Sequence, residues 1–467
     1  MPSRQDQLQS YQFAQQRVVA ALVAHDPDPR RSPLRRAGTT VLIGLVVAAL
    51  VVGAVAAYAL IRGGGKVDAR NPAVVFLERG TGARFVYLQA DDRLHPVLNF
   101  TSGLLIADAA TPSLREASAE SLAAVPLGDP LGIPDAPDSL PAAGALLPAR
   151  WTVCSGGQAR SVLIVGSAAS GGAALPVPRV GAPAEELRGL LVNDPADRTW
   201  LVHANQRFLL PPERVQQIRT RFGYTATPLA VAAAWLNAVP AGPDLDPPDL
   251  DDLGDASSVL PAADIGLLLR VRGEGSTPDQ WGVVLDDGVA DLTAVQAALL
   301  QTGATPVRVQ EISISGYGNL PRSRTDLVQQ SVAAGLPATV PALVNGPESV
   351  CLTYDGDIDI RVGAAVPSGV PVTNDPAVPG AVQADEVIVP RGKGAVVVST
   401  ASPEAPAESG TVSVITDTGR RFPLAGREVL TRLGYGGVTP VGVPGQLVSL
   451  LPPGPSLDPA AARRAPG

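Results

Sequence analysis

The stretch AGTTVLIGLVVAALVVGAVAAYALI, residues 37–61, decides how this chain is organised, because none of its 25 residues carries a charge. With a rise of about 1.5 Å per residue, a helix of this length crosses a hydrocarbon core of about 30 Å. The stretch therefore predicts one transmembrane helix, with a short segment before it and a long region after it.

The residues before this stretch predict its orientation. Four arginines lie there, and by the positive-inside rule they keep the N-terminus in the cytosol: Arg30, Arg31, Arg35 and Arg36. The alternative is a cleaved signal peptide that ends near the small residues Ala57 and Ala59. A signal peptide, however, has a shorter apolar segment and a shorter charged region before it. We therefore predict an uncleaved, single-pass anchor in the inner (plasma) membrane, with an extracytoplasmic, periplasmic C-terminal region.

Length and composition restrict the class of protein further. A chain of 467 residues is too long for one compact core, so several modules are expected. The net charge of −8, with no long basic block after the anchor, argues against nucleic-acid binding. The 48 glycines and 46 prolines predict many turns and short elements. The low aromatic content of 4% argues against large aromatic-lined ligand sites.

The chain contains two cysteines, Cys154 and Cys351, and both follow the anchor. In an oxidising exterior an even number of cysteines indicates a disulfide. Two unrelated buried thiols are the alternative. Metal binding is less favoured, because no histidine lies near either cysteine in the sequence.

The segment before the anchor, residues 1–36, predicts an amphipathic cytosolic helix with an Arg-rich hinge. Ser3 and Asp6 resemble a capping box, and the prolines of HDPDP, residues 25–29, end the helix. Its apolar side chains share one face: Leu8, Tyr11, Val18 and Leu22. Because the polar face carries glutamine rather than lysine, we predict that this helix binds a partner protein rather than the membrane surface.

The region after the anchor contains an internal repeat. FGYTATPLAVAAAWLNAVPAGPDLDP, residues 222–247, matches LGYGGVTPVGVPGQLVSLLPPGPSLDP, residues 433–459. Weaker copies of the associated strand-turn-strand pattern begin near Phe85 and Trp281. We therefore predict an α+β fold: an elongated region of four small α+β repeats around a central β-rich, barrel-like domain. The expected ranges are a linker at 62–75, repeats at 76–122, 191–248, 249–305 (with a linker) and 406–460, central-domain parts at 123–190 and 306–405, and a tail at 461–467.

Catalytic and metal-binding patterns are weak throughout the chain. No GxSxG motif accompanies His95 or His203, and His203 falls in a predicted strand where we expect a surface or turn role. The glycines at 63–65 lack the spacing of a phosphate-binding loop. The acidic run from 244 to 255 lacks the EF-hand pattern, and Asp355, Asp357 and Asp359 are expected on a solvent-facing strand. The sequence therefore predicts no catalytic residue, no cofactor and no metal.

Several segments, in this order along the chain, are similar to the pattern of one protein family. They are the N-terminal run SRQDQLQSYQFAQQRVVAALVAHDPDPRRSPLRR with the anchor, LHPVLNFTSGLLI (94–106), WTVC (151–154), RTWLVHANQRFLLP (198–211), LNAVPAGPDL (236–245), SVCLTYDG (349–356) and LGYGGVTPVGVPGQLVSLLPPGPSLDPAAAR (433–463). The chain thus resembles EccB, the bitopic core component of actinobacterial type VII (ESX) secretion systems.

The resemblance implies four repeat domains, which resemble a phage-lysin cell-wall-binding fold, around a barrel-like domain closed by a Cys154–Cys351 disulfide. The partners that it implies are the FtsK/SpoIIIE-type ATPase EccC, EccD, EccE, the mycosin protease and other copies of the chain. Family members are sometimes labelled ATPases, but this sequence contains no Walker motif. We therefore expect a structural and assembly subunit rather than an enzyme. The alternatives are a peptidoglycan-binding membrane tether and a weak extracytoplasmic nucleotide hydrolase.

Overall fold

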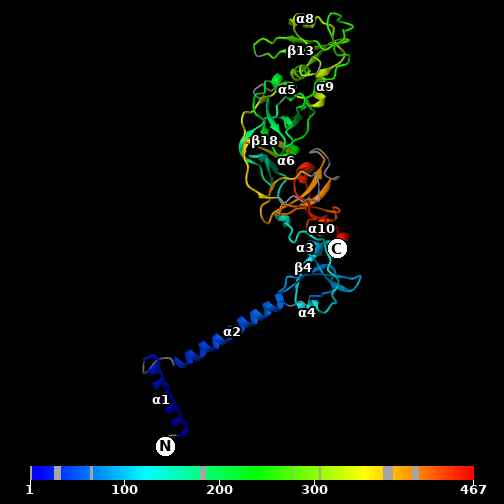
Figure 1. The fold of residues 1–467 in the computed structure, drawn as a ribbon. Coiled ribbons are helices and arrows are strands. Elements are labelled where there is room, and N and C mark those ends of the chain that lie inside the picture. The colour runs from blue at the N-terminus through cyan, green and yellow to red at the C-terminus, as the bar shows by residue number, and fades with distance from the viewer. Residues whose placement is uncertain are drawn as a thin grey trace. The chain divides into compact units, whose positions relative to one another are not determined.

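The computed structural model describes residues 3–25, 33–63, 67–178, 186–275, 277–303, 305, 307–371, 382–401 and 410–466. The chain divides into two compact units, Met1–Asp68 and Ala69–Gly467, and we describe each by itself. The fold is mixed α+β (Figure 1).

The first unit contains two helices, α1 (Arg4–Ala24) and α2 (Pro33–Gly63). The predicted capping box is confirmed: the backbone N–H of Asp6 donates to Ser3 Oγ at 3.3 Å, and the backbone N–H of Ser3 donates to Asp6 Oδ2 at 3.1 Å. The helix ends at His25, whose φ of 55° is left-handed. Within α2, the 21 residues Gly38–Tyr58 are long and apolar enough to cross a membrane, and they overlap the predicted span.

The second unit contains four small sheets and one large sheet. The first small sheet consists of β1 (Val74–Glu78), β2 (Arg84–Leu88), β3 (Arg93–Pro96) and β4 (Ser113–Ala117). The second consists of β8 (Arg188–Asn193), β9 (Thr199–His203), β10 (Gln206–Leu209) and β11 (Leu229–Ala230), and β16 (Ala342–Leu343) also pairs with β8. The third consists of β12 (Leu268–Val271), β13 (Gln280–Leu285), β14 (Gly288–Leu292) and β15 (Val309–Glu311). The fourth consists of β21 (Ala395–Thr400), β22 (Thr411–Ile415), β23 (Arg421–Pro423) and β24 (Val441–Pro444).

All four small sheets share one connection. Their strands are ordered third, second, first, fourth, and the fourth strand runs parallel to the first. A parallel pair needs a crossover connection, and a helix supplies it in each case. These crossover helices are α3 (Phe100–Ile106), α5 (Val215–Phe222), α7 (Ala294–Leu300) and α10 (Val429–Arg432).

A second helix follows the fourth strand in each small sheet. These helices are α4 (Ala119–Leu122), α6 (Ala233–Ala238), α8 (Ile314–Gly318) and α11 (Gly445–Ser449). After each of them the chain returns and forms a parallel bridge beside the third strand: Leu94 with Leu127, Arg207 with Ala241, Val289 with Arg322, and Arg421 with Pro453. We call each small sheet with its two helices a module, numbered 1 to 4 in chain order.

The large sheet differs from the barrel-like domain that the sequence suggested. Its strands are β5 (Trp151–Gly156), β6 (Arg160–Val165), β7 (Ser170–Ala174), β17 (Ser349–Asp355), β18 (Asp357–Ala365), β19 (Val370–Pro371) and β20 (Glu386–Ile388). They are ordered β19-β20-β6-β5-β17-β18-β7, and in the described residues the two end strands do not pair with each other. The expectation of a closed barrel was therefore wrong for this part of the chain. Alternating apolar residues predict strands, but closure also needs hydrogen bonds between the two edges.

The strand β21 belongs to module 4, although the predicted range of the central domain, 306–405, contains it. The predicted boundary between residues 405 and 406 therefore falls between two strands of one module, because β21 pairs antiparallel with β22. Similarly, β16 lies in that central range but pairs with β8 of module 2.

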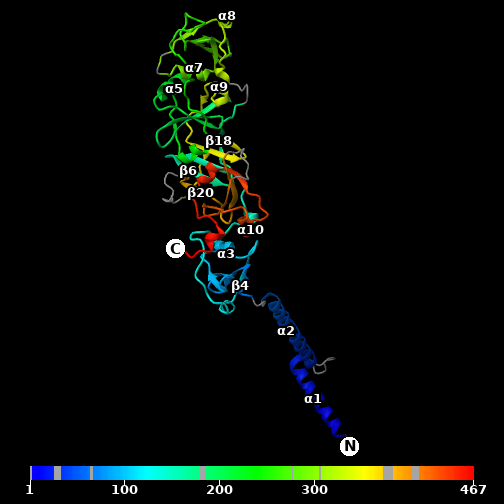
Figure 2. The same cartoon turned by 90° about the vertical axis from the view of Figure 1, so that its right-hand side faces the viewer.

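Buried side chains connect neighbouring parts of the second unit. One core cluster joins the large sheet to modules 2 and 4, and a second joins module 1 to module 4. A third joins modules 2 and 3 through α5 and α7, which lie side by side in Figure 2. Arg432 and Arg463 donate hydrogen bonds to the carbonyls of Ala107 (2.8 Å) and Ile106 (3.1 Å), at the end of α3. The remaining helices are α9 (Leu327–Ala334), α12 (Pro459–Ala462) and a 3₁₀ turn, Ala143–Ala145.

The disulfide Cys154–Cys351 lies in the middle of the large sheet. The two residues face each other in the antiparallel pair β5–β17, with a Cα–Cα distance of 4.0 Å, and both side chains are fully buried. Their sequence separation is 197 residues, and modules 2 and 3 lie inside the closed loop. The two modules are thus an insertion between strands of one sheet.

We expect the double substitution Cys154→Ser and Cys351→Ser to lower the free energy of unfolding by up to about 5 kcal/mol, because the unfolded chain regains the freedom of a long loop. The midpoint of urea unfolding, followed by tryptophan fluorescence, measures this change. The unaltered chain under reducing conditions is the control and should match the variant. Equal midpoints for the oxidised chain and the variant would contradict the prediction.

A glycine after the second helix lets the returning chain pass close to the third strand. A Cβ atom on Gly242 would lie 2.5 Å from Phe208 Cε1. Gly128 against His95 and Gly454 against Phe422 make the same close approach in modules 1 and 4.

We therefore expect Gly242→Ala to destabilise the chain by about 1–3 kcal/mol, the usual cost of overpacking a core. The matched control is Gly437→Ala, because a Cβ atom there meets nothing within 4 Å. Thermal unfolding compares the two variants, and equal melting temperatures would argue against the close approach.

Candidate functional site

Four apolar side chains of α1, which we call the stripe, fall on one face of the helix: Leu8, Tyr11, Val18 and Leu22, with exposed fractions between 59% and 74%. The apolar residues of α1 are not confined to this face, because Phe13, 60% exposed, lies on the opposite side. Side chains of this type, left exposed along one helix face, are suited to packing against another protein. That they do so remains a prediction.

Four arginines before the span predict the orientation of the anchor. Arg30 and Arg31 lie outside the described residues, as do the side chains of Arg35 and Arg36. Their role in orientation therefore remains a prediction.

The two histidines of the second unit, His95 and His203, are buried and hydrogen-bonded. His203 is buried rather than at a surface or turn, so that expectation was wrong, because both faces of β9 are covered. Its Nδ1 lies 2.8 Å from the carbonyl oxygen of Arg188, and burial lowers the pKa of His203. His95 contacts the carbonyl of Asp129 and the carboxylate of Asp91.

Two of the three aspartates of β17 and β18 form ion pairs. Asp355 pairs with Arg150 at 2.5 Å, and Asp359 pairs with Arg361 at 2.8 Å. Within the part of the chain that the structure describes, no group of three or more His, Cys, Asp or Glu side chains is arranged to hold a metal ion.

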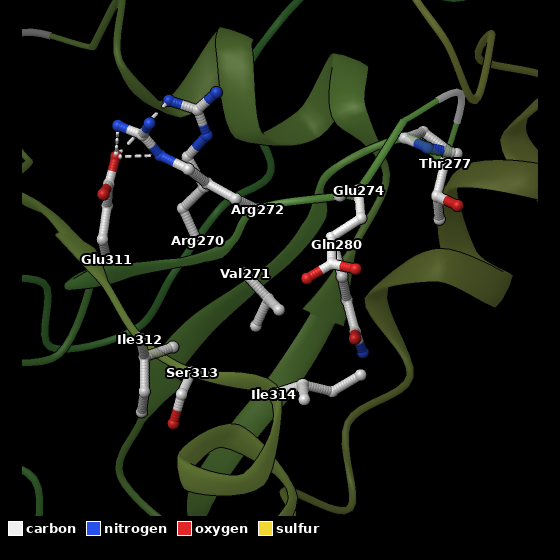
Figure 3. A pocket seen from close by; sticks show the side chains of 12 residues that line it. Arg270, Val271, Arg272, Glu274, Thr277, Gln280, Glu311, Ile312, Ser313 and Ile314 are labelled. Carbon is white, nitrogen blue, oxygen red and sulfur yellow. Dashed lines mark hydrogen bonds and ion pairs between the residues drawn. The ribbon is translucent and has the colours of Figure 1, made fainter.

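A cleft lies in module 3 (Figure 3). Its volume is about 750 Å³, and it opens where β12 and β15 end, between the turn at 273–275 and the start of α8. The apolar part of its lining includes Val271, Ile312 and Ile314.

Fixed ion pairs occupy the arginines of this cleft. Arg270 pairs with Asp279 at 2.5 Å, and Arg272 pairs with Glu311 at 2.5 Å. The other carboxylate oxygen of Asp279 accepts a hydrogen bond from the backbone N–H of Gly273 at 3.0 Å. This hydrogen bond, followed by those from Arg270, lowers the pKa of Asp279.

Glu274 is different, because no cationic side chain of the described residues pairs with its carboxylate. In Figure 3, Glu274 lies near Gln280, and the Arg272–Glu311 pair lies on the other side of Val271. The uncompensated charge of the lining is therefore negative, although two arginines line the same cleft.

Sequence reasoning missed this cleft. The alternation of Arg270 and Arg272 indicates one face of a strand, but Asp279 and Glu311 come from neighbouring segments. The pairing register of β12 with β13 and β15 decides which carboxylate meets which guanidinium. That register is a tertiary property.

These features define a protein with one candidate membrane span in its described residues and a mixed α+β region after it, and comparison with known proteins gives its family. Residues 1–466 match the family described as "Type VII secretion system ESX-1, transport TM domain B" (EccB). The chain belongs to this family, as the resemblance in its sequence indicated.

Relatives and solved structures agree with this assignment. The chain is 28% identical over 512 residues to the "ESX-3 secretion system ATPase EccB3" of Mycobacterium tuberculosis, which covers 98% of this chain and 88% of the relative. It is 28% identical over 506 residues to the "ESX-5 secretion system ATPase EccB5" of Mycobacterium marinum, which covers 98% and 93%.

Among solved structures, the EccB3 dimer from the ESX-3 core complex matches with a TM-score of 0.58 and 26% identity, over 84% of this chain and 100% of that chain. A chain of an intact ESX-5 inner membrane complex matches in fold, with a TM-score of 0.63 and 23% identity, over 100% and 96%.

The hydrogen bonds of Asp279 predict a local response to acid. Because its pKa is lowered in the folded state, the contribution of Asp279 to stability is present above its unfolded pKa of about 3.9 and is lost as the pH falls through the lower, folded value. We therefore expect Asp279→Asn to speed hydrogen exchange in the turn at 273–275 at neutral pH, and to remove its acid sensitivity.

Hydrogen-exchange mass spectrometry of the peptide that spans this turn measures both effects. Asp251→Asn in the solvated acidic run is the control and should change neither. Unchanged exchange in the Asp279→Asn variant would show that the carboxylate does not hold the turn.

Proposed function

We propose that this chain is a structural and assembly subunit of a type VII (ESX) secretion inner-membrane complex, and that it supports protein export through protein–protein contacts. The family match over residues 1–466 carries this proposal, because it includes the candidate membrane span, the modules and both cysteines. The solved relatives add support, since they are described as parts of ESX complexes and, for EccB3, as a dimer.

The proposed topology follows from the anchor. The arginines before the span keep α1 in the cytosol, and the second unit is extracytoplasmic. A buried disulfide in the second unit supports this orientation, because disulfides persist in oxidising compartments.

The proposed domain organisation follows from the four modules. We assign them to the four repeats that the sequence suggested, near 76–122, 191–248, 249–305 and 406–460. Module 3 also takes β15 and α8, module 4 also takes β21, and the large sheet, built from β5–β7 and β17–β20, forms the central domain. The shared strand order and the shared helix positions support this assignment.

The proposed partners lie on both sides of the membrane. They are an EccC-type ATPase, EccD, EccE, the mycosin protease and other copies of this chain, with peptidoglycan as an alternative partner of the modules. We propose no catalytic role. The relatives carry "ATPase" in their names, but the sequence of this chain contains no GxxxxGK[ST] motif.

The test is affinity purification of the tagged, full-length chain from its own membranes in mild detergent, with mass spectrometry and sizing. We expect a large particle that contains an FtsK-like ATPase and a multi-span protein. A chain that purifies alone and partitions with cell-wall material would contradict the proposal and favour the tether.

The stripe on α1 gives this test a sharper form. We expect Leu8→Ser with Leu22→Ser to reduce recovery of the cytosolic partner at least about tenfold, because two buried aliphatic contacts are worth more than 1.4 kcal/mol. Gln9→Ala with Gln16→Ala, off the stripe on the same helix, is the matched control. Equal recovery with both variants would mean that the stripe is not the contact.

A further inference from the structure

In module 1 the returning chain crosses the third strand over a histidine, whereas in modules 2 and 4 it crosses over a phenylalanine. At each of these crossings a glycine of the returning chain lies against the ring: Gly128 on His95, Gly242 on Phe208 and Gly454 on Phe422. The parallel bridges give the three rings one position, directly after Leu94, Arg207 and Arg421. Module 1 therefore has an ionisable ring where two other modules have an apolar one.

Both ring nitrogens of His95 face oxygen atoms that accept hydrogen bonds. The ring is buried, its Nδ1 lies 2.8 Å from the carbonyl oxygen of Asp129, and its Nε2 lies 2.9 Å from Asp91 Oδ2. A neutral imidazole donates from one nitrogen only, and an ionised carboxylate donates from neither oxygen. The two contacts therefore need one proton more than a neutral ring beside an ionised aspartate carries. Because the side chain of Asp91 is 42% exposed, solvent can supply that proton and remove it.

His203 shows that burial alone does not produce this arrangement. Its Nδ1 also lies 2.8 Å from a backbone carbonyl, that of Arg188, but no carboxylate of the described residues forms an ion pair with its ring. Burial lowers the pKa of His203, so its ring is uncharged near neutral pH. The carboxylate of Asp91 is thus what distinguishes the surroundings of His95.

The other charged groups near His95 have partners of their own or point to the backbone. The further titratable side chains of the strands, turn and returning chain around the ring are Arg84 and Tyr87 of β2, Asp92 of the β2–β3 turn, Arg93 of β3 and Asp129. Asp92 accepts a hydrogen bond from Tyr87 and pairs with Arg70 at 3.2 Å. Arg84 pairs with Asp138, and Arg93 donates to the carbonyl of Leu127. The crossover helix α3 carries no titratable side chain. Among the described residues, the ion pair of the His95 ring is with Asp91.

The ring lies where the chain leaves module 1 for module 4. Two backbone hydrogen bonds hold the returning chain to β3, from the Gly128 N–H to the Leu94 carbonyl (3.0 Å) and from the Leu131 N–H to the Pro96 carbonyl (2.9 Å). Directly after them, Ile133 enters the core cluster that joins modules 1 and 4. The N–H of Gly132 donates to the carbonyl of Arg464 at 3.3 Å. A looser crossing therefore loosens the connection between the two modules.

We propose that the crossing of module 1 is a pH-sensitive clamp, in which a proton between His95 and Asp91 fixes residues 126–131 against β3. At low pH the proton is present and the clamp is closed. As the pH rises through the range in which histidines lose their charge, two acceptors are left facing each other, and the returning chain is held less tightly. This inference goes beyond the proposed function, because the clamp lies within one chain.

The experiment measures hydrogen exchange of the full-length chain in mild detergent at about pH 5 and about pH 8, on either side of the histidine range. Protection factors correct for the intrinsic effect of pH on amide exchange. We expect the protection of the peptide 126–131 to be about tenfold lower at the higher pH, the usual effect of losing a hydrogen bond to a charged group. The peptide 240–245 is the matched control, because it crosses Phe208 with equivalent backbone hydrogen bonds. Its protection should be equal at both pH values.

Two variants locate the proton. In Asp91→Asn the new amide N–H can donate to the Nε2 of a neutral ring, and in His95→Phe the ring becomes that of modules 2 and 4. We expect the protection of 126–131 to be equal at both pH values in each variant. Asp91→Asn keeps the histidine and decides alone if His95→Phe does not fold.

Three results would overturn the inference. One is equal protection of 126–131 at both pH values in the unaltered chain. The second is a fall of the same size in the peptide 240–245, which would show a general effect of pH on the unit. The third is a pH dependence of 126–131 that survives Asp91→Asn.

Discussion

The antiparallel pairing of β5 with β17 is the contact on which the second unit depends. It joins segments that are separated by about two-fifths of the chain, and the disulfide Cys154–Cys351 lies in its middle. The neighbouring pairs reinforce it: the hydroxyls of Thr152 and Thr353 lie 2.9 Å apart, and Trp151 faces Tyr354. Closing so long a loop costs conformational entropy, and the covalent bond removes much of that cost from folding. The chain leaves the large sheet after β7 to form modules 2 and 3 and re-enters it at β17, so the β5–β17 pairing holds the two ends of this insertion together.

The modules show how one small fold serves two purposes. Its sheet and crossover helix form a core of their own, and the helix after the fourth strand supplies a surface. Where that helix is apolar, as α6 and α11 are, it becomes part of a larger core. In module 3 the corresponding residue, Tyr317 of α8, is buried in a core cluster of that module. Modules with one strand order thus contribute to different parts of the core of the unit.

Membership of the EccB family agrees with these structural features. Within the described residues, this chain combines a candidate span with four modules of one strand order. Asp355 and Asp359 form ion pairs and His203 is buried, so these polar groups contribute to holding the fold.

The sequence alone determined the apolar span, the helix with its Ser3–Asp6 cap and the repeated strand and helix pattern, because each depends on neighbours a few residues apart. The single cysteine pair also indicated the disulfide, since no other partner was present. Only the tertiary structure decided that the large sheet is open in the described residues, that β21 joins module 4, that His203 is buried and that Glu274 borders a cleft without an ion pair. These properties depend on strand register and on which faces are covered. Such long-range contacts bring together residues that a local pattern does not relate.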